Sequence, residues 1–146
     1  MPKFTKTKKL LYSKSELCDL VLDIDSYSEF LPWCLASRIN NKEDNLILAD
    51  LVIGFKLFRE KFTSEVIFTY PEEISVKYVD GPFKYMNNYW KFISMDDSIE
   101  TEVFFDIDFE FKSLVLEKLI GTVFNRAADK MIDAFELRAK EVYGKK

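Results

Sequence analysis

Carboxylates are the side chains that first suggest chemistry in this sequence, because none of its 146 residues is histidine. Without histidine, the chain lacks the commonest general base and the commonest metal ligand. Five acids alternate with other residues along one stretch, namely Glu100, Glu102, Asp106, Asp108 and Glu110. A calcium or magnesium site needs ligands that converge from a loop or from several elements. Acids spaced down one strand instead indicate its solvent-facing side, so we predict no metal site.

Cys18 and Cys34 form the second group that could react. Two cysteines are too few for a disulfide framework, and we expect both to be reduced and buried. Cys34 follows Trp33 directly, but the sequence contains no histidine that could activate the thiol. Because no pair of nucleophile and base is visible, we predict that the protein is not an enzyme and uses no catalytic cofactor.

A long amphipathic helix from Ser113 to about Tyr143 is the element around which the rest must be arranged. Apolar residues recur there at steps of three and four, so they share one side of the helix. Those in its first half are Leu116, Leu119, Ile120, Val123 and Ala127. Ser113 is a suitable N-cap, and Gly144 is a suitable stop. Because an apolar face does not stay in water, the preceding residues must cover it.

The preceding residues indicate a strand, two short helices and then several strands in succession. The expected elements are a strand at 3–12, helices at 14–24 and 25–31, and strands at 33–39, 46–53, 56–70, 74–78, 84–95 and 99–111, with a turn over 40–45. Ser13 and Glu16 fit a capping box for the first short helix, and Asp25 fits an N-cap of the second. Strands joined by short turns imply an antiparallel sheet, and a curved sheet closing around one long helix is an α+β arrangement.

Alternation along the strands assigns an aromatic-rich face to the interior. The inward residues expected from it are Phe62, Phe68, Tyr70, Met86, Asn88, Trp90, Phe92, Phe105 and Phe109. Aromatic residues make up 16% of the chain, so this interior is either an ordinary core or the lining of a cavity for an apolar ligand. If a cavity exists, Asn88 and Tyr70 are the polar candidates for orienting one end of the ligand, and the helical face described above forms its floor.

Two corners of the chain fit the rim of such a cavity. Phe30, Leu31 and Trp33 lie where the second short helix ends, either as an anchor of that end or as one lip of the cavity. Phe83 follows Gly81 and Pro82, a strong turn signal. The second corner is either a plain turn or a mobile loop that presents Phe83 at the cavity mouth or to a membrane.

Four motifs resemble the family of coenzyme-Q-binding proteins and ribosome-association toxin A. They are YSEFLPWC at residues 27–34, DGPFK at 80–84 followed by WKF at 90–92, FDIDFEF at 105–111, and AFELRA at 134–139. They occur in the order of that family and extend over essentially the whole chain. The resemblance implies one domain, residues 1–146, with a helix-grip START-like fold in which a curved antiparallel sheet of six to seven strands wraps around a long C-terminal helix.

The resemblance also implies a function, with two branches. In one branch, the apolar cavity holds ubiquinone or a similar isoprenoid lipid, and the protein is a quinone chaperone that supports respiration or quinone biosynthesis. In the other branch, the protein binds the large ribosomal subunit and blocks subunit association. Cyclases and hydroxylating enzymes share this fold, but a shared fold does not carry a function.

The charge pattern bears on partners and location. A net charge of −4 argues against an extended nucleic-acid surface, and we expect no binding to DNA. No run approaches the roughly 18 apolar residues that span a bilayer, and the first residues contain no apolar signal core. We therefore expect a cytoplasmic protein, or one peripheral to the inner membrane. The lysines at 3, 6, 8 and 9 are expected in solvent, on an anionic membrane surface, or on ribosomal RNA.

Overall fold

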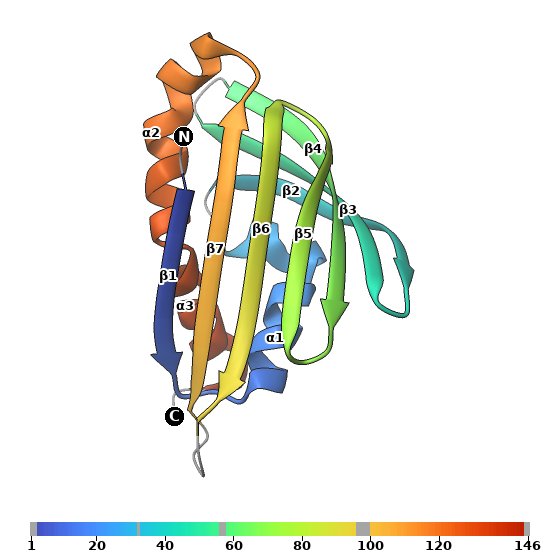
Figure 1. The fold of residues 1–146 in the computed structure, drawn as a ribbon, viewed down its shortest axis with the longest axis vertical. Helices are drawn as coiled ribbons and strands as arrows, with labels where there is room; N and C mark the ends of the chain where they lie inside the picture. The colour runs from blue at the N-terminus through green and yellow to red at the C-terminus, as the bar shows by residue number, and fades with distance from the viewer. Residues whose placement is uncertain (1–2, 32, 56–57, 96–99, 145–146) are drawn as a thin grey trace.

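One curved antiparallel sheet forms the body of the molecule (Figure 1). The computed structural model describes residues 3–31, 33–55, 58–95 and 100–144, and only the backbone of 55, 58, 119–121 and 123–125. In that part of the chain, seven strands pair in the order β1-β7-β6-β5-β4-β3-β2. The strands are β1 (Lys3–Leu10), β2 (Cys34–Glu43), β3 (Leu46–Phe55), β4 (Phe58–Thr69), β5 (Glu73–Asp80), β6 (Phe83–Ser94) and β7 (Thr101–Phe111). Each strand except β1 neighbours the next one in sequence, as the short turns predict.

The helices complete the α+β arrangement that the sequence predicts. They are α1 (Lys14–Leu22), the 3₁₀ helix η1 (Ile24–Glu29), α2 (Leu114–Asp129) and α3 (Met131–Tyr143). Two caps are confirmed: the Ser13 side chain and the Glu16 side chain form a capping box on α1, and the Ser113 hydroxyl accepts from the Val115 and Leu116 N–H groups. In Figure 1, β2 and β3 bend away from β6 and β7, so the sheet curls as a helix-grip fold requires.

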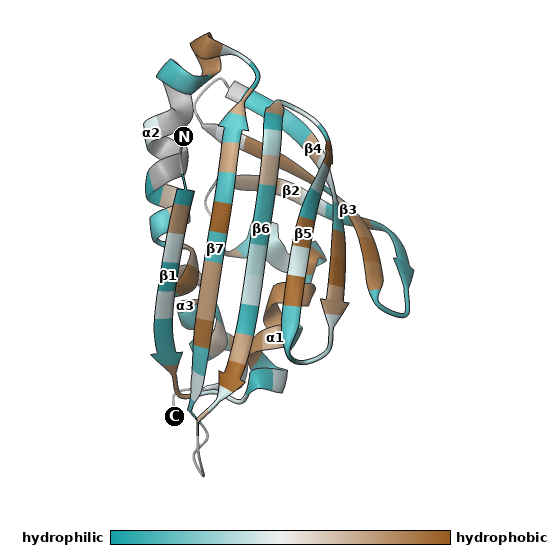
Figure 2. Ribbon diagram, in the orientation of Figure 1, coloured by the Kyte–Doolittle hydropathy of each residue, from teal (hydrophilic) through white to brown (hydrophobic). Residues whose placement is uncertain are grey.

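Strand alternation places the apolar side chains of β6 and β7 inside the molecule. Val103, Phe105 and Phe109 of β7 are almost fully buried, whereas Asp106 and Asp108 between them are partly exposed. The alternating bands along both strands are visible in Figure 2. The acidic row is therefore the outer face of a strand, as its spacing predicts.

The C-terminal helix is interrupted at Lys130, which the sequence pattern does not predict. Lys130 has φ −100° and ψ 9°, and its N–H donates to the Arg126 and Ala127 carbonyls at 3.1 and 3.2 Å. The expected single rod is therefore two segments. The break lets α2 pack on β7 and β1 while α3 packs against α1, so the two segments follow the curvature of the sheet.

The β2–β3 hairpin is longer than expected. We expected a turn over residues 40–45, but β2 continues to Glu43, which pairs with Leu46. Only Asp44 and Asn45 form the loop. The pairing of Asn41, Lys42 and Glu43 with the apolar strand β3 outweighs their low strand propensity, and a register shift between Ile39 and Asn41 leaves Asn40 unpaired.

Asp25 does not cap η1, contrary to our expectation. Residue 23 occupies the N-cap position, and no side chain caps this helix. The Asp25 Oδ1 atom instead accepts from the Ile39 backbone N–H at 2.8 Å. This hydrogen bond joins η1 to β2, so η1 lies at the edge of the apolar interior of the sheet.

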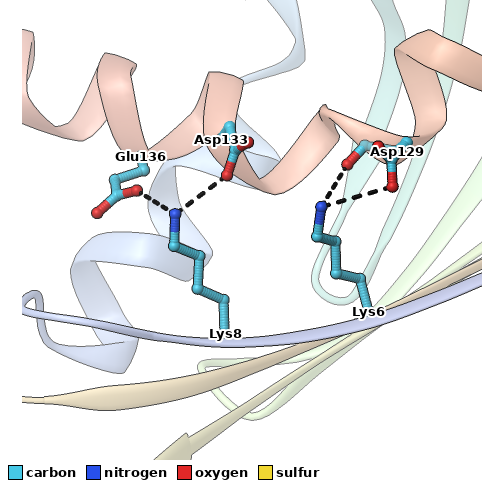
Figure 3. A network of polar contacts seen from close by, with 5 residues as sticks. All are labelled: Lys6, Lys8, Asp129, Asp133 and Glu136. Carbon is cyan, nitrogen blue, oxygen red and sulfur yellow. Dashed lines mark hydrogen bonds and ion pairs between the residues drawn. The ribbon is translucent and has the colours of Figure 1, made fainter.

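Lys6 and Lys8 do not point freely into solvent, which corrects one of our expectations for the N-terminal lysines. Both reach from β1 to the C-terminal helices (Figure 3). The Lys8 Nζ lies 2.8 Å from Glu136 Oε1 and 3.0 Å from Asp133 Oδ1, and the Lys6 Nζ donates to the Asp129 carbonyl at 2.9 Å. These contacts join the edge strand β1 to the helices. Lys3 and Lys9 are the lysines of this strand that remain exposed.

Replacing Lys8 with glutamine should lower the free energy of unfolding by ~1 kcal/mol, a value for a small, partly solvent-screened network. The hydrogen bonds to Glu136 and Asp133 raise the pKa of Lys8 above 10.5, and Lys8 lowers the pKa of Asp133 below 3.8. The stabilisation therefore persists between these values, fades as the pH falls through the lowered carboxyl pKa, and fades as the pH rises through the raised lysine pKa. Urea unfolding across pH measures it.

Lys9→Gln is the matched control, because Lys9 is the exposed neighbour on the same strand. We expect it to leave the free energy of unfolding almost unchanged. Equal losses for the two variants, or a Lys8→Gln effect that does not shrink at acidic pH, would contradict the network.

Candidate ligand-binding site

The concave side of the sheet encloses an apolar hollow of about 90 Å³, here called the inner cavity. Its walls come from α1, η1, the strands β3 to β7 and α3. The lining residues are Val21, Ile24, Tyr27, Leu31, Trp33, Leu51, Phe62, Ser64, Val66, Ile74, Val76, Met86, Asn88, Trp90, Ile107, Met131 and Phe135. Hydroxyl and amide groups come from three of them, Tyr27, Ser64 and Asn88. The inner cavity is therefore suited to a hydrocarbon ligand.

Two further hollows adjoin the inner cavity. The second cavity, of about 50 Å³, is lined by Trp33, Phe62, Phe83, Met86, Ile107, Phe109, Ala127, Ala128 and Met131. The outer groove, of about 810 Å³, is lined by Glu29, Phe30, Leu31, Trp33, Gly54, Arg126, Ala127, Lys130, Met131, Asp133, Ala134, Leu137, Arg138 and Glu141. Trp33 and Met131 line all three hollows. Leu31 also lines both the inner cavity and the outer groove, so these three side chains form the partition between the groove and the interior.

Backbone hydrogen bonds hold Trp33 at this partition. The Leu31 N–H donates to the Tyr27 carbonyl, and the Cys34 N–H donates to the Leu31 carbonyl, both at 2.9 Å. The Gly54 N–H donates to the Trp33 carbonyl at 3.0 Å. The end of η1 is thus an anchored helix end and also one wall of the groove, so our two interpretations of this corner are compatible.

Phe30 and Arg138 hold η1 onto α3 at the groove. The Arg138 guanidinium carbon lies 5.1 Å from the centre of the Phe30 ring, and the same ring packs edge-on against Phe135 at 5.1 Å. Arg138 also pairs with Glu29 at 3.1 Å. A cation over an aromatic face and an edge-to-face ring pair both stabilise this arrangement, which limits the width of the groove.

Two of the three polar side chains of the inner cavity, Asn88 and Tyr27, already have partners in the protein. The Asn88 Nδ2 donates to the Asp106 carbonyl at 2.8 Å, and the Asn88 Oδ1 accepts from the Trp90 Nε1 at 3.1 Å. The Tyr27 hydroxyl donates to the Val21 carbonyl, and burial raises its pKa. Asn88 therefore lies on the inward face as predicted, where it orients the Trp90 ring.

Apart from Tyr70, the predicted cavity residues divide into three groups. Those that line one of the three hollows are Phe30, Leu31, Trp33, Phe62, Phe83, Met86, Asn88, Trp90, Phe109 and Ala127. Phe68, Phe92 and Phe105 instead pack in the core, and Leu116 packs partly buried against it. The side chains of Leu119, Ile120 and Val123 lie outside the described residues. Which of these residues touch a ligand stays a prediction.

Tyr70 does not face the interior, contrary to our expectation. Its side chain is 50% exposed, because β4 ends at Thr69 and the alternation that predicts an inward position ends there too. The Tyr70 hydroxyl instead interacts with the Asp19 carboxylate of α1, which raises the Tyr70 pKa. Tyr70 therefore takes no part in the hollows.

Phe83 is buried, so the interpretation of a loop that presents it to a membrane is wrong. Its exposed fraction is 3%, and its ring stacks on Phe111 at 4.9 Å and meets Phe62 edge-on at 5.5 Å. The preceding turn passes close to β4, where Gly81 has φ +144°. Phe83 is thus a wall of the second cavity, fixed by neighbouring rings.

Sequence reasoning missed several lining residues, including Met131, Ile107 and Ser64. Ile107 shares its strand face with Phe105 and Phe109, and Ser64 shares its strand face with Phe62 and Phe68, so alternation is the signal that could have found them. Met131 lies four residues after Ala127, on the apolar side of the helical pattern. Its position at the partition follows from the break at Lys130, which has no sequence signal of its own.

Both thiols are predicted to be unreactive in the folded protein. Cys18 and Cys34 are free and buried, and burial raises their pKa values to about 12 and about 11. At about pH 8 the reactive thiolate is therefore scarce. We expect Ellman's reagent to detect almost no thiol in the native protein and both thiols after guanidinium is added. Fast labelling of the native chain would contradict the burial.

The described residues also bear on two other kinds of site, a metal site and a membrane-spanning helix. Across the described ranges, no group of three or more acidic or cysteine side chains is arranged to hold a metal ion. None of the helices in the same part of the chain combines the length and the apolar character needed to cross a bilayer. The three hollows therefore remain the strongest candidate for a functional site in the described part of the chain.

A curved antiparallel sheet that grips C-terminal helices around an apolar interior defines a START-like, helix-grip domain. A START superfamily protein from Mycobacterium smegmatis has this fold, with a TM-score of 0.79 at 16% identity, over 96% of this chain and 98% of that one. The profile of the family described as polyketide cyclase / dehydrase and lipid transport matches residues 12–136. The chain belongs to this family.

Curated relatives narrow the comparison to the branches that the motifs indicate. The chain is 44% identical to the protein named ribosome association toxin RatA from Rickettsia prowazekii, over 97% of this chain and 99% of the relative. It is 28% identical to coenzyme Q-binding protein COQ10 homolog B, mitochondrial, from Xenopus laevis, over 97% of this chain and 59% of that protein. The resemblance that the sequence motifs indicate is therefore confirmed.

Proposed function

We propose that this domain binds a single isoprenoid lipid of the ubiquinone class and carries it without catalysing a reaction. The observation that supports this most directly is the apolar inner cavity, which Leu31, Trp33 and Met131 divide from a wide surface groove. The name of the Xenopus relative, a coenzyme Q-binding protein, points to the same ligand class. Support of respiration or of quinone biosynthesis would follow from such a carrier.

Entry of the ligand requires side chains to move. An apolar cavity of about 150 Å³ accepts one benzene-sized molecule, whereas the inner and second cavities measure about 90 and 50 Å³. Methionine adapts to irregular spaces because it is unbranched and flexible. Displacement of Met131 would join the hollows into one channel, and burial of the isoprenoid chain would contribute roughly 25 cal/mol per Å² of apolar surface.

Native mass spectrometry of the purified protein, with organic extraction of bound lipid, tests this proposal. We expect an isoprenoid quinone to co-purify, and an added short-chain quinone to displace it. Trp90→Ala, which removes a wall of the inner cavity, should bind quinone more weakly, while Tyr70→Ala on the exterior should bind it normally. Absence of any bound or displaceable lipid would refute the proposal, and normal binding by Trp90→Ala would refute this choice of wall.

A second candidate function is binding to the large ribosomal subunit. The 44% identity to a protein named ribosome association toxin RatA favours it. The net charge of −4 means that contacts with RNA would be confined to local basic surface and would be sensitive to salt. Sucrose-gradient sedimentation tests it: we expect salt-sensitive co-migration with large subunits and fewer assembled ribosomes on overexpression. Unchanged profiles would remove this candidate.

One variant distinguishes the two candidates. Val76 lines the inner cavity from β5, so Val76→Phe should fill part of it and weaken quinone binding. Ser75→Phe adds a phenyl ring on the opposite face of the same strand and is the matched control. We expect only Val76→Phe to lose quinone binding, and neither variant to change sedimentation with ribosomes if that interaction uses the outer surface.

A further inference from the structure

The outer groove contains both charges and exposed apolar surface. Its acids already have partners: Arg138 lies 3.1 Å from Glu29 and 3.7 Å from Glu141, and Lys8 lies 3.0 Å from Asp133. Leu137 adds a 62% exposed apolar side chain to the same groove. Each acidic side chain of the groove therefore has a cationic partner within the protein, although Arg138 is shared by two of them.

Arg126 and Lys130 are the cations of the groove that remain available. Both are exposed, and neither forms a salt bridge within the described residues. They are four residues apart, with Lys130 at the end of α2, so they lie on one side of the helix. In a chain of net charge −4, this pair makes the rim beside Ala127 locally positive.

The inner cavity offers a polar head group fewer free partners than the outer groove, because two of its three hydroxyl and amide side chains are already engaged. Asn88 and Tyr27 are already hydrogen-bonded to the protein. An oxygen-bearing head group buried there would lose its water without full replacement, which costs about 1–3 kcal/mol for each unsatisfied group. The groove, in contrast, leaves the head group close to water and to two cationic donors.

We propose that the ligand binds with its tail inside and its head group outside, a conclusion that rests on the proposed lipid-binding function. The hydrocarbon tail passes between Trp33 and Met131 into the inner cavity. The head group lies in the outer groove, where Arg126 and Lys130 donate hydrogen bonds to its oxygens. The ligand class is thus a single-chain amphiphile whose head group carries acceptor oxygens, either neutral carbonyls or an anionic group.

Binding titrations on the double variant Arg126→Gln/Lys130→Gln test the role of the two cations. Decylubiquinone serves as the neutral probe and farnesoic acid as the anionic probe. We expect at least one probe to bind the variant about tenfold more weakly, as the loss of two charged donors near water implies. If the neutral probe is affected, the head group is carbonyl-like; if only the acid is affected, and mainly at low salt, it is anionic.

Lys77→Gln/Lys91→Gln is the matched control, because it removes the same charge from exposed lysines on the outer face of β5 and β6. Circular dichroism and the melting temperature establish that both double variants fold. Unchanged affinity of Arg126→Gln/Lys130→Gln for both probes, or an equal loss in the control, would overturn the head-group site and leave the proposed function standing. Failure of the unaltered protein to bind either probe would instead refute the proposed function.

Tryptophan fluorescence gives an independent measure of the orientation. Trp33 lines the outer groove, whereas Trp90 lines only the inner cavity. A quinone ring quenches the indole that it approaches. In single-tryptophan variants saturated with decylubiquinone, we expect stronger quenching of Trp33 (in Trp90→Phe) than of Trp90 (in Trp33→Phe). The reverse order would overturn the proposed orientation.

Discussion

Replacing Phe135 with alanine is expected to lower the free energy of unfolding by about 3–5 kcal/mol, the usual range for a buried phenyl ring. Phe135 is 4% exposed, and its ring centre lies 5.1 Å from that of Trp90, 5.1 Å from that of Phe30 and 5.6 Å from that of Tyr27. The substitution therefore removes the contact that joins α3 to both η1 and the sheet. Urea unfolding monitored by circular dichroism measures the loss.

Phe104→Ala is the matched control, because Phe104 lies on the outer face of β7 and contacts the Tyr89 ring at 6.1 Å. It should cost about 1 kcal/mol or less, since an aromatic pair near the surface contributes about that much. Similar losses for the two variants would contradict the central role of Phe135. Phe135 also lines the inner cavity, so Phe135→Ala, like Trp90→Ala, should bind decylubiquinone more weakly and gain less melting temperature from it than the unaltered protein.

Gly81→Ala should lower the free energy of unfolding by about 2–5 kcal/mol, because strain and overpacking act together. Gly81 has φ +144°, and an added Cβ atom would lie 2.5 Å from the Phe62 Cβ and 2.9 Å from the Phe62 Cα. The neighbouring atoms are backbone or close to it, so they cannot move aside cheaply. The turn before Phe83 would have to lift away from β4, with a lower midpoint in urea as the result.

Gly144→Ala separates the contribution of backbone strain from that of overpacking. Gly144 has φ +84°, but an added Cβ atom there would have no neighbour within 4 Å. Its loss should be about 1 kcal/mol, from backbone conformation alone. If Gly81→Ala were no more destabilising than Gly144→Ala, the close approach of the turn to Phe62 would not matter.

Much of the fold follows from local sequence patterns, because these patterns record which groups are exposed to water and which are buried. Ser13 and Ser113 cap their helices as predicted, since an unpaired backbone N–H needs an acceptor next to it in sequence. The alternation in β7 assigns its faces correctly, since one shift in register would bury its acids. The same reasoning identified a minority of the residues that line the three hollows, including Phe62, Met86 and Trp90.

The errors occur where a long-range contact outweighs a local preference. Asn41 lies in a strand because it pairs with Leu48 of β3, and Lys8 is engaged because β1 is an edge strand beside the acidic side of α3. Tyr70 follows an inward pattern but lies one residue beyond the end of β4. The partners of Lys8 are distant in sequence, so no local pattern records that contact.

The amino-acid sequence by itself determined the class of fold, the inward faces of the strands and the apolar character of the interior, because these depend on the periodic burial of side chains. The tertiary structure decided where the interior stays hollow. The break at Lys130, the η1–β2 corner and the Arg138–Phe30 contact meet at one place. There they leave Leu31, Trp33 and Met131 as a thin partition between a surface groove and an inner cavity. A cavity is the space that packing leaves unfilled, so it becomes defined only once all of its walls are in place.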